Sequence, residues 1–172
     1  MTRLLALDIA TTTGYAVDMP SGGDRPLFGN FKVDSDGGEA LGRAFAQFRR
    51  DLLGLVSLHK PEILAFEAAL TERLHGLDAS LLLLGLGAMV ELTGFELDLE
   101  VYSCDVSTVR RHFVGSAYPK NPKVVVMDRC KSLGWTPKTF DESDSGAVWD
   151  YAKAMLRAGE VEARALHAAR LT

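Results

Sequence analysis

Cysteine and histidine, which dominate thiolate and zinc chemistry, are scarce in this sequence. The 172 residues include two Cys, Cys104 and Cys130, which form no CxxC pair, and four His without the spacing of metal ligands. A thiolate metal site and a disulfide framework are therefore excluded, and we expect a reduced, intracellular protein. Ser143 and Ser145 have no visible His partner that would act as a base, which disfavours nucleophilic catalysis by serine.

Long hydrophobic runs are lacking as well. Four apolar residues at 4–7 precede Asp8, whereas the apolar region of a signal peptide has roughly 7–15 residues. The most apolar stretch, residues 79–90, is shorter than the roughly 20 residues that span a bilayer, so we expect a buried helix and no membrane partner. The sequence also contains no internal repeat and no low-complexity linker. We therefore expect residues 1–172 to form a single domain located in the cytoplasm.

The apolar residues that are present predict an alternation of strands and helices. Apolar runs bounded by turn residues predict strands at 3–9, 14–19, 27–33, 62–67 and 97–103. Helical spacing predicts helices at 39–59 and 79–92, the second ending at Gly94, and the rest of the chain is expected to be helical. One late helix begins at the cap Asn121 and stops at Gly134, and the last covers about 141–158. This order predicts an α/β fold with a five-stranded mixed sheet flanked by helices.

Four carboxylates stand in positions that ordinary surface residues seldom occupy. Asp8 interrupts an apolar strand and Glu67 ends another, although a Glu at a strand end is usually solvated. Asp141 and Asp144 open the last helix and, being three residues apart, share one face of its first turn. Acids in a first turn also interact favourably with the helix dipole, which is their commonest role. If the four converge, they form an oxygen-donor site that suits Mg²⁺ or Mn²⁺.

Positive charge is concentrated in one segment of an otherwise acidic chain. The formal net charge of −4, from 19 Lys and Arg against 23 Asp and Glu, argues at face value against a nucleic-acid partner. Residues 107–140, however, contain seven Lys and Arg and one Asp, which is about +6 by count and leaves about −10 elsewhere. Lys120 and Lys123 flank the start of a helix, where a phosphate would be well placed. Together with the acids, this segment indicates a phosphodiester substrate over a metal centre, although a solvated basic face is the alternative.

The motifs and their order resemble the RuvC family of Holliday junction resolvases, within the RNase H-like superfamily, and in particular its phage-type members. Leu5 to Ala16 is similar to the family's first catalytic strand and turn, and Ile63 to Glu67 to its second acid site. Further similarities lie in the glycine-bearing helix at 84–88, in the Lys-x-x-Val helix at 123–126 with Gly134-Trp135, and in the closing acid pair and helix at 141–152. The resemblance covers residues 4–152 and implies an RNase H-like three-layer fold.

This resemblance implies a nuclease mechanism and the residues that carry it. Asp8, Glu67, Asp141 and Asp144 would hold two Mg²⁺ ions roughly 3.5–4 Å apart, with Mn²⁺ as a substitute. One ion would activate water for in-line attack on the phosphorus, and the other would stabilise the leaving 3′ oxygen, which gives a 5′-phosphate product. Lys123 would lie near the scissile phosphate, where a fixed positive charge offsets developing negative charge.

The resemblance also implies partners. A homodimer would nick symmetric strands of four-way or other branched DNA in a bacterial or phage-infected cell, and the apolar helix at 79–90 is either its interface or part of its own core. Arg110, Arg111 and Lys120 would contact phosphates and position the strand.

Leu70 occupies the place where cellular members have an aromatic wedge and would act as an apolar wedge. Gly146 replaces a Leu and should weaken the last helix by up to ~1 kcal/mol.

Two other functions remain open from the sequence. Residues 8–14 also resemble the phosphate turn of actin-like, Hsp70-like and sugar-kinase nucleotide-binding proteins, which need two domains around the nucleotide. The other alternative is a non-catalytic junction-binding module on the same fold. Clustered acids are awkward for such a module, because uncompensated carboxylates near phosphates weaken DNA binding.

Overall fold

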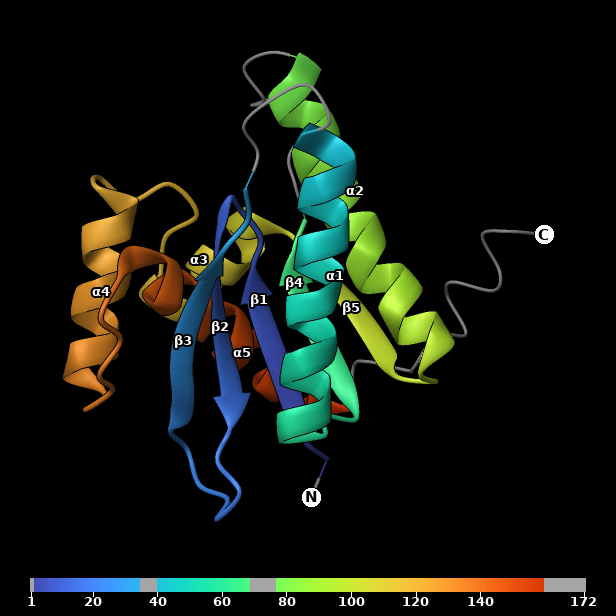
Figure 1. Ribbon diagram of the computed structural model, residues 1–172. Helices are drawn as coiled ribbons and strands as arrows, with labels where there is room; N and C mark the ends of the chain where they lie inside the picture. Colours follow the sequence, from blue (N-terminus) through green and yellow to red (C-terminus); the bar gives the residue numbers. More distant parts are fainter. Residues whose placement is uncertain (1, 35–39, 69–76, 160–172) are drawn as a thin grey trace.

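The fold is built on one five-stranded mixed sheet. A computed structural model describes residues 2–34, 40–68 and 77–159 (Figure 1). The strands are β1 (Leu4–Asp8), β2 (Thr12–Asp18), β3 (Pro26–Lys32), β4 (Ile63–Glu67) and β5 (Glu100–Cys104), in the spatial order β3-β2-β1-β4-β5. The β1–β2 and β2–β3 pairs are antiparallel, and the β1–β4 and β4–β5 pairs are parallel. The predicted fold class, a mixed sheet that is antiparallel first and parallel later, is confirmed.

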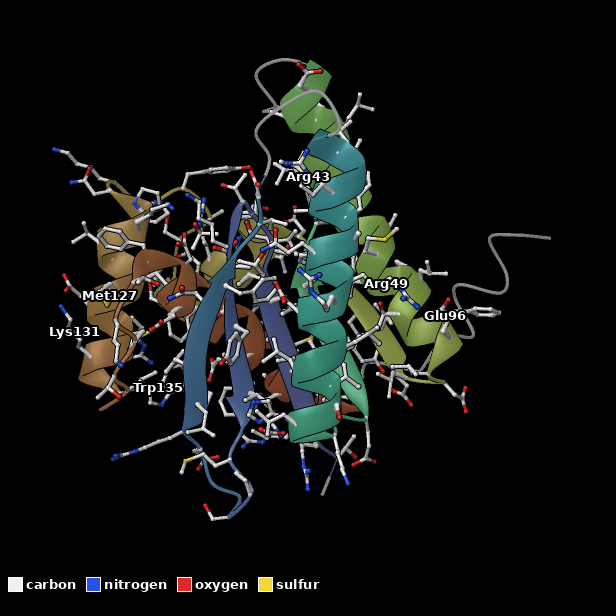
Figure 2. The ribbon with its side chains drawn as sticks, viewed as in Figure 1. Arg43, Arg49, Glu96, Met127, Lys131 and Trp135 are labelled. Carbon is white, nitrogen blue, oxygen red and sulfur yellow. The ribbon has the colours of Figure 1, made fainter. Side chains whose placement is uncertain are left out.

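Helices cover both faces of this sheet and make three layers, as Figure 1 shows. The helices are α1 (Ala40–His59), α2 (Leu77–Glu96), α3 (Val106–Val114), α4 (Pro122–Ser132) and α5 (Phe140–Ala158). The first two pack on one face, where Arg49 of α1 also forms an ion pair with Glu96 of α2 (Figure 2). The last three pack on the other face.

Strand alternation separates the two cores and decides where the acids point. Successive strand residues face opposite sides, so Leu4 and Ala6 of β1, with Ile63 and Ala65 of β4, lie in the core beneath α3, α4 and α5. The residues between them, such as Leu5 and Leu64, lie in the core beneath α1 and α2. Continuing the alternation places Asp8 and Glu67 on the α5 face. Both acids therefore end their strands beneath the same helix.

Three local predictions differ from the structure. Helix α2 continues through the buried Gly94 to Glu96, where the N–H of Leu97 still bonds to the carbonyl oxygen of Thr93, and β5 accordingly begins at Glu100 rather than at 97. Asn121 precedes α4 as predicted, but its φ of 54° is left-handed and its side chain makes no capping hydrogen bond. Its carbonyl oxygen instead accepts from the backbone N–H groups of Val124 and Val125.

Helix α2 also differs from the expected short buried helix. Residues Asp78–Glu96, with a mean hydropathy of 1.4, are long and apolar enough to cross a membrane by length and composition. Leu82, Leu86 and Val90 are buried against the domain, which identifies α2 as a packed helix of the fold. The large apolar residues of α2 that are exposed form a stripe, which we call the α2 stripe and which consists of Leu81, Leu84, Leu92 and Phe95.

Two glycines let α5 pack directly against the sheet. A Cβ atom at Gly14 of β2 would overlap the backbone carbonyl oxygen of Asp141. A Cβ atom at Gly146 would lie 2.9 Å from a ring carbon of Phe28. Gly146 lowers the intrinsic stability of the helix, but the close approach of α5 to β2 and β3 requires a residue without a side chain. The position of α5 is thus defined by the strands beneath it.

Candidate active site

Asp8 and Glu67 are brought together by the parallel pairing of β1 with β4. The register pairs Leu7 with Phe66, so the two acids, each one residue further along, end neighbouring strands on the same face of the sheet. In a parallel pair, the carboxyl ends of both strands lie at the same edge. The sheet therefore presents two carboxylates side by side at that edge.

The first turn of α5 brings the second pair of acids to this edge. Thr139 caps the helix, its side-chain oxygen accepting a hydrogen bond from the backbone N–H of Glu142 at 3.2 Å. Asp141 is partly exposed and Asp144 is buried. Repulsion from both raises the pKa of Asp8, and the backbone of Asp141 packs on Gly14, the residue of β2 that pairs with Asp8. The first turn of α5 therefore lies over the strand end that carries Asp8.

This concentration of negative charge is electrostatically costly in the absence of a cation. Burial, followed by repulsion from Glu67, Asp144 and Asp141, raises the pKa of Asp8 well above its ordinary value. Burial also raises the pKa of Glu67 to about 7, against the opposing charge of Arg110. The pKa of Asp144 is raised to about 6, again mainly by burial. Such shifts are typical of carboxylates gathered to perform chemistry.

Two cations border the acids. The Nζ atom of Lys123, in the first turn of α4, lies 3.7 Å from an Oδ atom of Asp141. Arg110 of α3 is half-buried, and its positive charge lowers the pKa of Glu67 and of Asp144. The sequence suggested only a phosphate contact for Arg110, whereas in the structure its charge also acts on the carboxylates of Glu67 and Asp144.

The other two predicted phosphate contacts, Arg111 and Lys120, are not among the charges that shift the pKa values of the acids. Arg111 on α3 and Lys120 before α4 are exposed. Neighbouring His112, by contrast, bonds to Asp150 through its Nε2 atom at 3.0 Å. The predicted wedge, Leu70, lies outside the described residues.

The donor chemistry of the site fits a hard divalent cation. Four carboxylates offer oxygen ligands alone, which Mg²⁺ and Mn²⁺ prefer, and burial together with repulsion from neighbouring carboxylates raises the pKa of Asp8, Glu67 and Asp144. Within residues 2–34, 40–68 and 77–159, no three His, Cys, Asp or Glu side chains already form a compact ligand cluster. Binding an ion would therefore require the acids to turn toward it.

Sequence reasoning missed the residues that hold the acid pair in place. Glu142, between the two α5 acids, is buried, and its Oε1 atom accepts a hydrogen bond from Nδ2 of Asn30 at 2.8 Å. Its Oε2 atom accepts from the backbone N–H of Lys138 at 2.5 Å. The capping spacing of Thr139 and Glu142 was a visible signal, but nothing near Asn30 indicated a partner 112 residues away.

Comparison with known structures shows the fold. RuvC of Thermus thermophilus aligns with a TM-score of 0.75 at 18% identity, covering 94% of this chain and 99% of that chain. The same protein in complex with a Holliday junction substrate aligns with a TM-score of 0.73 at 15% identity, covering 95% and 99%.

A third match is the yeast mitochondrial Holliday junction resolvase Ydc2, with a TM-score of 0.61 at 10% identity, covering 86% of this chain and 75% of that chain. No model of a protein family matches the chain, and neither does any curated protein sequence. The chain therefore has the RNase H-like fold of these proteins, and the expectation of a RuvC-like architecture is confirmed.

Proposed function

We propose that this protein is a metal-dependent endodeoxyribonuclease that resolves Holliday junctions, or related branched DNA, by paired symmetric nicks that leave 5′-phosphate ends. One observation carries the proposal: Asp8, Glu67, Asp141 and Asp144 converge at one edge of the sheet, bordered by Lys123 and Arg110. Acids alone would repel a DNA backbone, whereas acids that hold cations, flanked by basic side chains, attract one. The resolvases that share the fold support the choice of branched DNA as substrate.

The four carboxylates would hold the metal, two Mg²⁺ ions or Mn²⁺ in their place. When bound, these ions supply a water of lowered pKa for attack on phosphorus and positive charge for the leaving oxygen. Asp8 and Glu67 present their carboxylates from rigid strands, and Asp141 and Asp144 from a capped helix turn, so the ligands are supported by regular structure.

The bordering cations have separate tasks in this proposal. Lys123 is more than half exposed at 56%, so its ammonium group can leave Asp141 and meet a phosphate of the substrate. There it would stabilise negative charge that develops on the phosphate oxygens. The positive charge of Arg110 acts on Glu67 and Asp144, and its side chain would position the scissile strand over them. Arg111 and Lys120 would contact phosphates farther from the cleaved bond.

Paired nicks need two sites, and the α2 stripe suits a homodimer interface. Leu81, Leu84, Leu92 and Phe95 recur near heptad spacing and are exposed on a helix whose other side is buried in the core. A second copy of the chain would cover the same stripe by two-fold symmetry. The predicted role of this helix as a dimer interface is therefore kept in the proposal.

The test is a cleavage assay on four-way, Y-shaped and linear duplex DNA in parallel, with Mg²⁺ and with a chelator. We expect Mg²⁺-dependent, symmetric nicks in the four-way junction with 5′-phosphate ends, and no cleavage by Asp8→Asn. Wild-type cleavage by Asp8→Asn would overturn the metal mechanism. Junction binding that is unchanged by Mg²⁺ and gives no product would support the non-catalytic module instead, and tight Mg-ATP binding in equilibrium dialysis would support a nucleotide-binding domain.

A further inference from the structure

One transverse row of the sheet underlies the candidate active site. Asp8 of β1 pairs with Gly14 of β2, and Gly14 pairs with Asn30 of β3. Directly paired residues on adjacent strands lie on the same face, so all three residues face α5. The row therefore contains one active-site carboxylate, one position without a side chain and one amide.

The first turn of α5 contacts this row at two of its three positions. The backbone of Asp141 lies so close to Gly14 that a Cβ atom there would overlap its carbonyl group. The next residue, Glu142, accepts the hydrogen bond from Asn30 at 2.8 Å. Gly14 and Asn30 thus position the acid pair over Asp8. Neither contact uses the side chain of Asp141 or of Asp144.

Glu142 is suited to hold this turn rather than to bind a metal. Its side chain is buried, with 4% of its surface exposed, and both of its oxygens already accept hydrogen bonds. The second bond, from the backbone N–H of Lys138, ties the segment before the helix to the same carboxylate. One side chain therefore joins β3, the approach to α5 and the helix turn itself.

The far end of α5 is anchored independently. Asp18, at the other end of β2, accepts hydrogen bonds from Nε1 of Trp149 at 3.0 Å and from Nζ of Lys153 at 2.5 Å. This second anchor stabilises the docked helix without touching the turn that carries the acids. It provides a control that separates stability from positioning.

We propose that Asn30 and Glu142 are positioning residues, whose hydrogen bond fixes the first turn of α5 so that Asp141 and Asp144 meet Asp8 and Glu67 around a divalent cation. The inference rests on the proposed function. Loss of partners that orient ligating carboxylates typically reduces metal affinity or activity about 10- to 100-fold. We expect a reduction in that range for Asn30→Ala in Mn²⁺ affinity and in kcat, with little change in KM for DNA, because the phosphate contacts are untouched.

The experiment measures Mn²⁺ binding by titration calorimetry, the unfolding midpoint, and kcat and KM on a four-way junction. The variants are Asn30→Ala, Asn30→Asp, Glu142→Gln and the double variant Asn30→Asp with Glu142→Gln, with Trp149→Phe as control. Asn30→Asp places a second carboxylate against that of Glu142 and should weaken Mn²⁺ binding. In the double variant the amide of Gln at 142 can donate to the carboxylate of Asp at 30, so Mn²⁺ binding should be restored. Glu142→Gln alone should leave the Mn²⁺ affinity near that of the wild type. The amides of Asn30 and of Gln at 142 can hydrogen-bond to each other, and the amide oxygen can still accept from the N–H of Lys138.

The control distinguishes positioning from stability. Trp149→Phe removes the hydrogen bond to Asp18 and should lower the unfolding midpoint while Mn²⁺ affinity is unchanged. Equal loss of Mn²⁺ affinity in Trp149→Phe and Asn30→Ala, or failure of the double variant to recover, would overturn the positioning role. If the wild-type protein bound no Mn²⁺, the proposed function itself would fail. If the wild type bound Mn²⁺ and Asn30→Ala bound it equally well, only the positioning role would be overturned.

Discussion

Lys123 places its ammonium nitrogen 3.7 Å from a carboxylate oxygen of Asp141, so a cation from α4 directly faces the acid pair that opens α5. Because this lysine is mostly exposed, the ion pair itself contributes little to stability. Its value in the proposed function lies in the positive charge that it brings to the edge of the metal site.

Replacement of Lys123 should therefore affect the reaction more than the fold. We expect Lys123→Met to reduce the single-turnover cleavage rate by about 100-fold, the typical effect of removing one group that stabilises transition-state charge. The unfolding midpoint should scarcely move. Lys131→Met is the matched control, because Lys131 is an exposed lysine near the other end of the same helix (Figure 2). Equal loss of rate in both variants would mean that general DNA attraction, and not proximity to the acids, explains the effect.

The acids should make the metal-free protein less stable as pH rises. The pKa of Glu67 is raised from 4.5 to about 7, mainly by burial, so in this interval the folded state keeps a proton that the unfolded chain has lost. The free energy of unfolding then falls as pH rises from 4.5 toward 7 and stays low above it.

Glu67→Gln should remove this decline and make the metal-free protein more stable than wild type at about pH 8, with little gain at about pH 4. Urea unfolding in the presence of a chelator measures the difference. Addition of Mg²⁺ should stabilise the wild type at the higher pH and the variant less, since the variant lacks one ligand. If the free energy of unfolding depended on pH in the same way in both proteins, burial would not disfavour the ionised form of Glu67.

DNA binding should depend strongly on salt because the proposed contacts are to phosphates. Each phosphate contact that is lost should lower the slope of log K against log salt by about one. Arg111→Ala and Lys120→Ala should therefore weaken junction binding at low salt, with shallower slopes, as measured by fluorescence anisotropy. Binding should also be weaker without divalent cations, when the acids repel the backbone. Affinity that is independent of salt would contradict the interpretation of the basic segment.

The close approach of α5 to β2 gives a prediction about glycine. Gly14→Ala introduces a methyl group where the carbonyl of Asp141 lies, so we expect destabilisation of roughly 1–3 kcal/mol, as for overpacked cores, together with loss of cleavage. Gly42→Ala in α1 meets no atom within 4 Å and should be neutral or stabilising by about 0.5–1 kcal/mol. Chemical denaturation compares the two. A Gly14→Ala protein with wild-type stability and activity would show that α5 can shift freely over β2.

The α2 stripe gives a prediction about assembly. Leu84→Glu places a charge in the middle of the exposed stripe and should convert the proposed dimer to a monomer in analytical ultracentrifugation, with loss of paired nicking. Leu58→Glu is the control, because Leu58 is an exposed leucine on α1 that lies outside the stripe. A wild-type protein that sediments as a monomer on junction DNA would remove the basis for symmetric nicks.

The sequence was sufficient for features that depend on local pattern. Alternating apolar residues determine strand faces, so Asp8 and Glu67 could be placed at strand ends, and the spacing of Asp141 and Asp144 put them on one helical turn. Features that depend on tertiary packing were not predictable in the same way. Gly146 had an evident cost in helix propensity, but its benefit, contact with Phe28, exists only once α5 lies on β3.

The exposure of α2 illustrates the same limit. Its apolar composition predicted burial, yet composition does not reveal how much neighbouring structure is available to cover a helix. In the structure, α1 and the sheet cover one side of α2 and leave Leu84 and Phe95 exposed. Likewise, Thr139 caps the helix by a local bond to the N–H of Glu142, whereas the bond of Glu142 to Asn30 exists only once α5 lies on β3.

The row of Asp8, Gly14 and Asn30 also bears on when the site can exist during folding. The two hairpin pairings that create the row involve neighbouring strands, whereas docking of Glu142 on Asn30 joins residues 112 positions apart. Contacts of such separation incur a large loop-closure entropy and tend to form late. A chain still in synthesis would therefore display a finished sheet edge before it had a complete set of metal ligands. The proposed nuclease activity would then begin only after α5 has docked on the completed sheet.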